Sequence, residues 1–216
     1  MLVDLLRSYL QTGRNHRILD IGCGGGLFFA ELEQFGEVEG IEVDAGMKTG
    51  LESVDSRIHW GPLETFRTSH RFSAVLMLDV LEHLQRPVDA VRMARDLLEP
   101  GGVLIVTVPA FPMLWTSHDV INEHVVRYTC RTLASVARDA GAKPERLRYF
   151  FHWLFPVKLM VRLLERLSPR RADASPIPRT PPAPVNSACF LLSRMEQASF
   201  RAISLPLGSS LLMVAR

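Results

Sequence analysis

Two acids and a glycine-rich loop near the start of the chain are the residues best suited to bind a ligand. Asp20 lies in the short aliphatic run 17–21, and four glycines occupy the five positions 22–26. Glycine lacks a Cβ and tolerates a positive φ, so such a loop lets the backbone approach a ligand closely. Apolar residues at helical spacing follow at 28, 32 and 35. The stretch predicts a strand, a binding loop and a helix, the opening of a nucleotide-binding βαβ unit.

The acids indicate which kind of ligand this loop holds. A dinucleotide-binding loop reads G-x-G-x-x-G and faces a pyrophosphate, but here the third glycine comes one position early, at Gly26, and Leu27 takes its place. Asp20 would repel a pyrophosphate in a partly desolvated site and would attract an ammonium or sulfonium group. Glu42 ends a strand-like run twenty residues after Gly22, where a carboxylate can accept both hydroxyls of a ribose. S-adenosylmethionine carries an ammonium, a sulfonium and a ribose, and it has no phosphate.

The chain resembles the class I S-adenosylmethionine-dependent methyltransferases from about residue 17 to residue 129. The segments that carry the resemblance follow the family's motif order: 18–26, 40–44, 59–64, 72–84 with its Leu-Glu-His, and 98–109. Pro62 stands where the family commonly has an acid beside the adenine, so Leu63 and the backbone would make that contact. The resemblance implies S-adenosyl-L-methionine as cofactor. The cofactor-binding residues it implies are Asp20, Gly22, Cys23, Gly24, Gly26, Glu42, Val43, Pro62, Leu63, Leu78 and Asp79.

A second polar segment, residues 109–129, would follow the fifth strand. Loops at the carboxyl ends of the strands bind the ligands of open α/β sheets. This segment and the Gly-x-Ser-Leu at 208–211 resemble one subgroup of uncharacterised bacterial methyltransferases (type 11/12-like), a resemblance that implies no substrate. The candidate catalytic residues are His83, His118, His124 and Tyr128. The histidines are the candidate general bases, needed only when the acceptor carries a proton of high pKa.

The same residues have alternative roles. His118, Asp119 and His124 can all ligate divalent ions, but their irregular spacing is easily met by chance, and we expect no metal site. They can instead hydrogen-bond one another and hold the loop over the pocket. His83 can be a helix-start residue that shapes the methionine end of the pocket, and Asp79 is expected to order a loop or contact the cofactor.

Alternating elements predict the fold class. We expect an α/β, Rossmann-like, doubly wound sheet of seven mainly parallel strands. The resemblance implies that the last strand is antiparallel and lies beside the sixth. The predicted strands are 17–21, 37–42, 57–60, 72–78, 103–108, 143–150 and 210–215. Amphipathic helices are predicted over 2–10, 88–98 and 129–140, the last ended by Gly141.

About sixty residues separate the last two predicted strands, far more than a hairpin needs. They predict an insertion over residues 151–206. Residues 153–167 form an apolar helix with one charged stripe, and residues 168–185 hold six of the fourteen prolines. Asn186 is a candidate cap of a further helix. Residues 143–179 contain nine Lys and Arg against three acids, a local charge of nine minus three, or +6. The insertion can be helices packed on the core, a cap over the substrate pocket, or an element facing an anionic membrane.

Composition fits a single methyltransferase domain over 1–216 with that insertion inside it. Of its 216 residues, 47% are hydrophobic and 22% charged, and the net charge is +2. Three scattered cysteines predict a reducing compartment rather than a disulfide framework or zinc site. The sequence shows no export signal and no run of the ~20 apolar residues that span a bilayer. We expect a cytoplasmic protein, with peripheral binding at the inner membrane face left open, and no nucleic-acid partner.

The predicted activity is transfer of a methyl group from S-adenosylmethionine to an O, N or C atom of a small-molecule or lipid-like acceptor. One alternative is a non-catalytic S-adenosylmethionine-binding or interaction protein of the same fold. A second is an NAD-dependent oxidoreductase, which Asp20 and Leu27 disfavour. The identity of the acceptor and the oligomeric state stay open at this point.

Overall fold

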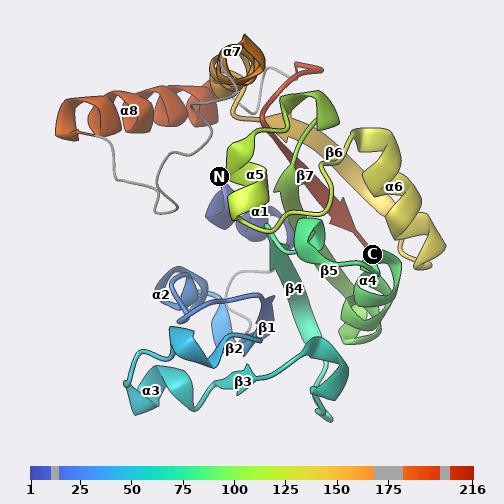
Figure 1. Ribbon diagram of the computed structural model, residues 1–216. Helices are drawn as coiled ribbons and strands as arrows, with labels where there is room; N and C mark the ends of the chain where they lie inside the picture. The colour runs from blue at the N-terminus through green and yellow to red at the C-terminus, as the bar shows by residue number, and fades with distance from the viewer. Residues whose placement is uncertain (11–14, 168–181, 200–204) are drawn as a thin grey trace.

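The computed structural model is built on one seven-stranded sheet, and it describes residues 1–10, 15–167, 182–199 and 205–216. The strand order is β3-β2-β1-β4-β5-β7-β6 (Figure 1). β7 lies between β5 and β6 and runs antiparallel to both. The predicted fold, with its antiparallel last strand beside the sixth, is confirmed.

The strands match their predicted positions within one or two residues, with one exception. They are β1 (His16–Ile21), β2 (Gly36–Glu42), β3 (Ile58–Trp60), β4 (Phe72–Leu78), β5 (Leu98–Pro109), β6 (Pro144–Phe150) and β7 (Ser210–Ala215). The exception is β5, which begins five residues before the predicted Val103. Leu98 pairs with Phe72 across an irregularity in the ladder, so the Pro-Gly-Gly turn lies inside the strand.

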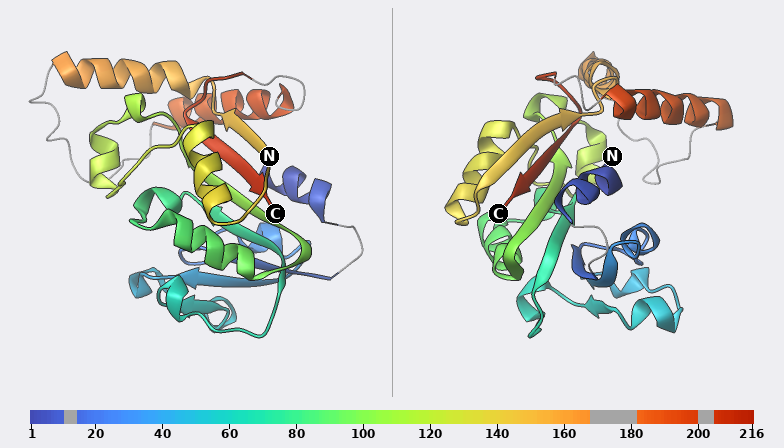
Figure 2. Two further views of the ribbon diagram at one scale, coloured as in Figure 1. Left: turned by 90° about the vertical axis from the view of Figure 1, so that its right-hand side faces the viewer. Right: turned by 180° about the vertical axis from the view of Figure 1, so that it is seen from behind.

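Helices cover both faces of the sheet (Figure 2). The sheet thus separates two hydrophobic clusters, one on each face. On one face α4 (Pro87–Asp96) and α6 (Cys130–Asp139) pack against alternate residues of the central strands, such as Val75 and Leu104. On the other face α1 (Leu2–Tyr9) and α2 (Phe29–Leu32) pack against the intervening residues, such as Ala74 and Ile105. This alternation follows from the two-residue repeat of a strand buried on both faces.

Short helical turns connect these elements. They are η1 (Ala45–Met47), α3 (Glu52–Asp55), η2 (Leu63–Thr65), η3 (Leu81–His83), η4 (Pro112–Leu114) and α5 (Ser117–Ile121). The helix predicted after the glycine loop is also short, because α2 ends at Leu32 and excludes Phe35. The amides of Phe35 and Gly36 bond to the carbonyls three residues before them, which turns the chain into β2.

The insertion contributes α7 (Leu154–Leu167) and α8 (Ala183–Ser199), joined by residues 168–181, which lie outside the described part. The predicted capping role of Asn186 is wrong. Its amide donates to the carbonyl of Pro182, so helical hydrogen bonding begins a turn earlier, and Pro184 is tolerated in a first turn. α8 extends away from the sheet in Figure 1 and in the right-hand view of Figure 2.

Candidate active site

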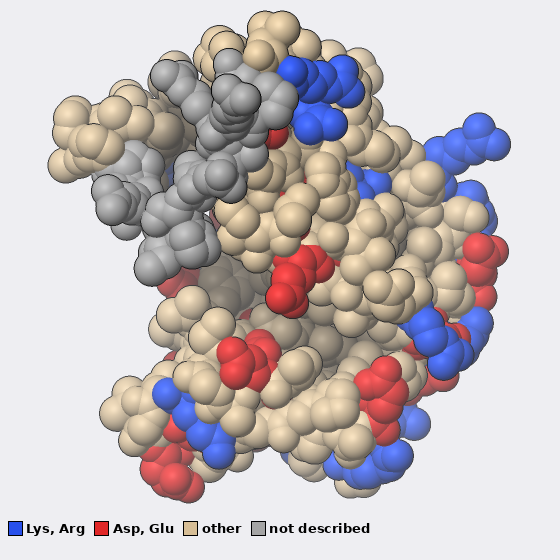
Figure 3. All heavy atoms as spheres, in the orientation of Figure 1, with Lys and Arg blue, Asp and Glu red and all other residues tan. Residues whose placement is uncertain are grey.

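The carboxyl ends of the parallel strands bring the predicted cofactor residues to one edge of the sheet. Asp20 of β1 is level with Gly40 of β2 and with Leu76 of β4. The loops after these three strands therefore open at the same edge, where open α/β sheets bind ligands. The molecule is hollowed on this face, and acidic side chains border the hollow (Figure 3).

The glycine loop has backbone conformations that require glycine. Gly22, Gly24 and Gly26 have φ values of +75°, +56° and +72°, a region that L side chains rarely adopt. A Cβ at Gly22 would lie 2.5 Å from Cγ2 of Val80. The loop therefore stays close to the exit of β4, and the amides of Gly22 and Cys23 anchor it on the carbonyl of Ile41.

Glu42 is held in place at the end of β2. One carboxylate oxygen accepts a hydrogen bond of 2.8 Å from the amide of Gly24, and the other accepts one of 3.0 Å from the amide of Asp44. The amide of Gly61 donates to the Glu42 carbonyl, which brings the start of the Pro62–Leu63 turn beside it. Each carboxylate oxygen keeps a free lone pair, so this group can accept ribose hydroxyls without moving.

Asp20 is buried without a neutralising partner. Its side chain accepts no hydrogen bond and forms no ion pair with the part of the chain that the structure describes. Burial, and secondly the charge of Glu42, raise the pKa of Asp20 to about 7. An ammonium placed here would recover much of that desolvation cost. Burial, with the nearby acids, also raises the pKa of Cys23 to about 12, so the thiol stays protonated and is no nucleophile.

The exit of β4 forms the next part of the edge. Leu78 is half-buried there, and Asp79 has a φ of +54°, a left-handed conformation that costs energy for a residue with a side chain. Its amide donates to the carbonyl of Thr107. Burial raises the pKa of Asp79, and the hydrogen bond from the Thr107 hydroxyl opposes this. Val43 is exposed at the far end of the same edge.

The structure brings two of the four candidate catalytic residues together. The rings of His83 and His124, which are 41 residues apart, have centroids 4.8 Å apart at an interplanar angle of 83°. Nδ1 of His124 lies 2.9 Å from Oδ1 of Asp119. Burial, followed by the neighbouring His124, lowers the pKa of His83. His83 is therefore neutral at physiological pH and can accept a proton.

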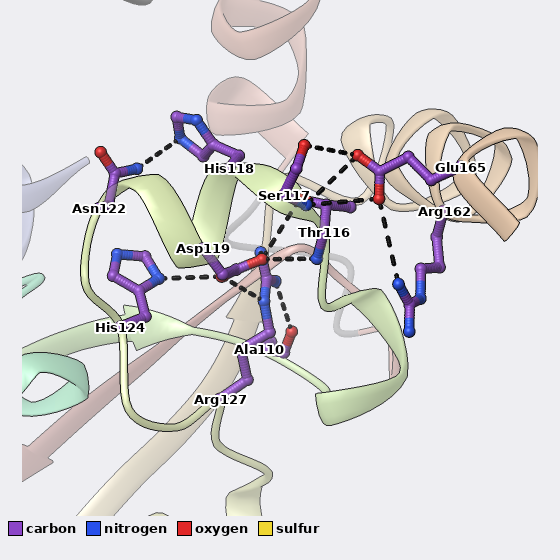
Figure 4. A network of polar contacts seen from close by, with 10 residues as sticks. All are labelled: Ala110, Thr116, Ser117, His118, Asp119, Asn122, His124, Arg127, Arg162 and Glu165. Carbon is purple, nitrogen blue, oxygen red and sulfur yellow. Dashed lines mark hydrogen bonds and ion pairs between the residues drawn. The ribbon is translucent and has the colours of Figure 1, made fainter. Parts of the chain in front are cut away.

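A buried network holds His124 (Figure 4). The fully buried carboxylate of Asp119 accepts bonds from Nε and Nη2 of Arg127 at 2.7 and 3.0 Å, and from the amide and hydroxyl of Thr116. Nη1 of Arg127 donates to the carbonyl of Ala110. These contacts join α5 to the loop after β5. The expected mutual hydrogen bonding is thus present between Asp119 and His124.

The other two candidates lie apart from this pair. His118 is exposed on α5, and its Nε2 lies 2.9 Å from Nδ2 of Asn122. The buried Tyr128 hydroxyl donates to the carbonyl of Leu81 at 3.2 Å, and burial raises its pKa to about 12. Tyr128 therefore braces the turn that carries His83, and its proton is hard to remove.

Comparison with known proteins identifies the family. A family model described as a methyltransferase domain matches residues 2–147. The chain belongs to this methyltransferase domain family. The match includes the glycine loop, Glu42, the exit of β4 and the histidine pair, and it ends before the insertion. The resemblance to the class I methyltransferases seen in the sequence is confirmed.

Two curated relatives indicate the range of chemistry near this domain. The first is the dTDP-3-amino-3,4,6-trideoxy-alpha-D-glucopyranose N,N-dimethyltransferase of Streptomyces venezuelae, 33% identical over 64% of this chain and 60% of that protein. The second is the ubiquinone biosynthesis O-methyltransferase of Bordetella avium, 31% identical over 62% of this chain and 65% of that protein. The chain thus spans a little under two thirds of each relative's length.

Solved structures share the fold. A SAM-dependent methyltransferase from Archaeoglobus fulgidus matches with a TM-score of 0.60 and 14% identity, over 99% of this chain and 92% of that one. Haemonchus contortus phosphoethanolamine N-methyltransferase 2, solved with S-adenosyl-L-methionine, gives 0.60 and 15% identity over 99% and 51%. At these identities the likeness concerns the fold alone.

Sequence reasoning missed one grouping in this methyltransferase domain. Possible ligand atoms of Glu82, His83 and His124 lie within 4.8 Å of one another, a set that could hold a divalent ion. Burial, with Asp79 beside it, raises the pKa of Glu82 to about 8. Closeness in sequence groups His118 with His124, whereas the residues that meet come from the Leu-Glu-His after β4 and from a distant loop.

Proposed function

We propose that this methyltransferase domain binds S-adenosylmethionine at the carboxyl edge of its sheet and transfers the methyl group to a small-molecule acceptor. The observation that carries the proposal is the unneutralised, buried carboxylate of Asp20 beside a preset Glu42 and a glycine loop. This arrangement is complementary to a ligand with an ammonium at one end and a ribose at the other. The names of the two curated relatives, an N- and an O-methyltransferase of small molecules, support it.

Each group at the edge has a defined part in this proposal. Asp20 binds the cofactor's ammonium, Glu42 accepts hydrogen bonds from the ribose hydroxyls, and the Pro62–Leu63 turn covers the adenine. The bound cofactor supplies a methyl group on a positively charged sulfur, so the protein mainly has to align the acceptor and exclude water. The acceptor lies at the other end, beside His83, His124 and the loop after β5.

His124 is the proposed general base when the methyl acceptor must lose a proton. Asp119, whose pKa is lowered by its hydrogen bonds with Arg127 and Thr116, stays ionised and accepts from Nδ1 of His124. This fixes the tautomer with a lone pair on Nε2, and the His83 ring lies beside that of His124, with centroids 4.8 Å apart. The neutral His83 stands next to it and can serve the same purpose or position the acceptor.

Ligand-induced stabilisation tests the proposal against its alternatives. S-adenosylmethionine and S-adenosylhomocysteine should raise the melting temperature, and NAD should not. Incorporation of labelled methyl groups from the cofactor into small molecules of a cell extract then separates an enzyme from a non-catalytic binding protein. Stabilisation by NAD alone would favour an oxidoreductase instead.

Replacing His124 by alanine should lower turnover about 10²- to 10⁴-fold if the base acts in the rate-limiting step. Affinity for S-adenosylhomocysteine should change less than threefold, because the residue lies at the acceptor end. His118→Ala is the matched control, since this exposed histidine of α5 faces Asn122. Steady-state kinetics with calorimetry checks both values. Weak cofactor binding with normal turnover at saturation would reverse the assignment.

We further propose that the insertion touches an anionic membrane surface and that the acceptor can be lipid-like. α7 turns its half-buried charged stripe of Lys158, Arg162 and Glu165 toward the protein. Its apolar residues face solvent instead: Val157, Met160, Val161, Leu163, Leu164 and Leu167. α8 exposes Phe190 and Leu191 beside Arg194. An outward apolar face with cations suits shallow insertion among anionic head groups.

Within the described residues no helix is long and apolar enough to cross a bilayer. Three residues of the basic segment 143–179 lie outside the described part: Arg170, Arg171 and Arg179. We propose that the protein works at the cytoplasmic face of the membrane, which it reaches through α7 and α8 by reversible contact.

Sedimentation with liposomes should show binding to anionic vesicles at low salt, little binding to neutral ones, and release at high salt. Leu163→Glu combined with Leu164→Glu should abolish it, because both side chains are exposed on α7 and their removal does not disturb a core. Leu51→Glu is the control, because Leu51 is similarly exposed and lies just before α3, outside the insertion. Absence of binding to anionic vesicles at low salt would leave α7 as a cover of the acceptor site only.

A further inference from the structure

We propose that Lys158 of α7 binds an anionic group, a carboxylate or phosphate, of the methyl acceptor. The inference rests on the proposed function and assigns the substrate class of that site. Lys158 lies in the insertion, beyond the residues that the family model matches. Its ammonium reaches the acceptor end of the sheet edge, where it interacts electrostatically with Arg127, Asp119 and Asp79.

Specific contacts fix α7 against the acceptor loop and so direct Lys158 inward. Glu165 accepts hydrogen bonds from the hydroxyl of Ser117 at 2.8 Å and from its amide at 3.3 Å, at the start of α5 (Figure 4). Seven residues earlier on the same face lies Lys158, a separation that keeps both on one side of a helix. The Phe155 ring packs edge-on against Phe111 of the loop after β5, with centroids 5.6 Å apart.

The ammonium of Lys158 is partly desolvated without a counter-charge of its own. It forms no hydrogen bond or ion pair within the described ranges 1–10, 15–167, 182–199 and 205–216. Asp119 is already neutralised by two hydrogen bonds from Arg127, and Asp79 bonds to the Thr107 hydroxyl. A half-buried cation left unpaired lowers the stability of the free protein. A ligand anion would supply the missing partner.

The position of Lys158 favours the acceptor over the cofactor. The proposed cofactor tail lies at Asp20 and the glycine loop, whereas Lys158 reaches the edge from the side of α5 and the histidine pair. The charged groups that face it are Asp79 from the exit of β4, Asp119 and His118 from α5, and Arg127 from the following loop. An acceptor held here by its anion would present its nucleophile toward His124 and the exit of β4.

The test compares Lys158→Met, which keeps the length of the side chain, with Lys158→Arg, which keeps the charge. Arg166→Met is the control, because Arg166 is exposed on the same helix. Benzoate, inorganic phosphate and neutral benzyl alcohol are titrated into the complex with S-adenosylhomocysteine. At least one anion should bind the wild type and Arg166→Met about ten- to a hundredfold more tightly than it binds Lys158→Met. Benzyl alcohol should not distinguish them.

A second arm uses labelled methyl transfer to a cell extract separated by anion exchange at neutral pH. Labelled products should be retained as anions, and Lys158→Met should reduce their formation about tenfold or more while Lys158→Arg restores part of it. Products found only in the neutral fraction, or equal anion binding by wild type and Lys158→Met, would overturn the inference.

Two further readouts separate other roles of Lys158. A fall in affinity for S-adenosylhomocysteine in Lys158→Met would assign the residue to the cofactor's carboxylate and refute an acceptor role. A lower melting temperature of that variant would show that Lys158 holds α7 in place, again against the inference, since loss of an unpaired buried charge should not destabilise the protein. If the wild type binds no cofactor at all, the proposed function itself fails, which the same calorimetry reports.

Discussion

Asp119→Ala should lower the free energy of unfolding by roughly 3 to 5 kcal/mol, the effect expected when one partner of a buried ion pair is removed. The carboxylate is fully buried and accepts from Arg127, His124 and Thr116. Without it the guanidinium of Arg127, itself almost fully buried, would be left without its counter-charge. Denaturant unfolding monitored by fluorescence and circular dichroism measures the loss. Asp139→Ala is the control, because Asp139 is an exposed acid of α6. It should lower the free energy of unfolding by less than about 1 kcal/mol.

A double variant separates loss of the charge pair from loss of packing. Asp119→Ala with Arg127→Met removes both charges and should unfold at higher denaturant than Asp119→Ala alone, because no uncompensated charge stays buried. A double variant that is less stable by the sum of the two single losses would show that the pair is not coupled. The single variant should also lose turnover, since Asp119 orients His124.

The pH dependence of this pair has a defined sign. The native pKa of Asp119 is lowered from its ordinary value. Its contribution to stability is therefore fully present above the unfolded pKa, about 3.9, and is lost only as the pH falls through the lower native value. The variant and the wild type should converge in stability in strong acid.

Asp20→Asn should weaken binding of S-adenosylhomocysteine by about 2 to 5 kcal/mol, the range for truncating one partner of a buried, hydrogen-bonded charge pair. The pKa of Asp20 in the free protein is about 7, and the ammonium of the ligand favours the ionised form. Affinity in the wild type should therefore fall about tenfold for each pH unit below 7, and binding near pH 6 should release a proton. Calorimetry in buffers of different ionisation enthalpy measures that proton.

Two variants sharpen this test. Asp20→Asn should bind with little pH dependence between 5.5 and 8, because the carboxyl that would titrate beside the ligand's ammonium has been removed. Glu42→Ala should lose the ribose contact, about tenfold or more in affinity for the loss of a charge-assisted hydrogen bond, and should keep a pH dependence. An unchanged affinity in folded Asp20→Asn would remove the assignment of Asp20 to the cofactor's ammonium.

The sequence by itself determined the frame of this methyltransferase domain, because local rules act within a few residues. Continuous apolar runs predicted strands such as β4 to the residue, and the glycines at 22, 24 and 26 stand where φ is positive. A carboxylate at Asp20, before a loop with one residue too few for a pyrophosphate, indicated a cationic ligand. These signals depend on backbone conformation and on spacing along one element, both of which are written in sequence order.

Only the tertiary structure decided which side chains meet. His83 and His124 belong to separate loops, and they are neighbours because β4 and β5 are paired and end at one edge. Whether Asp119 serves a metal, a histidine or an arginine depends on the packing of α5 against the following loop. The sequence also did not predict which face of α7 packs against the protein. A charged stripe is typical of a face turned to solvent. Glu165 nevertheless binds Ser117, so the stripe faces inward and the apolar residues are exposed. Helical periodicity separates two faces but does not state which one the rest of the chain will cover.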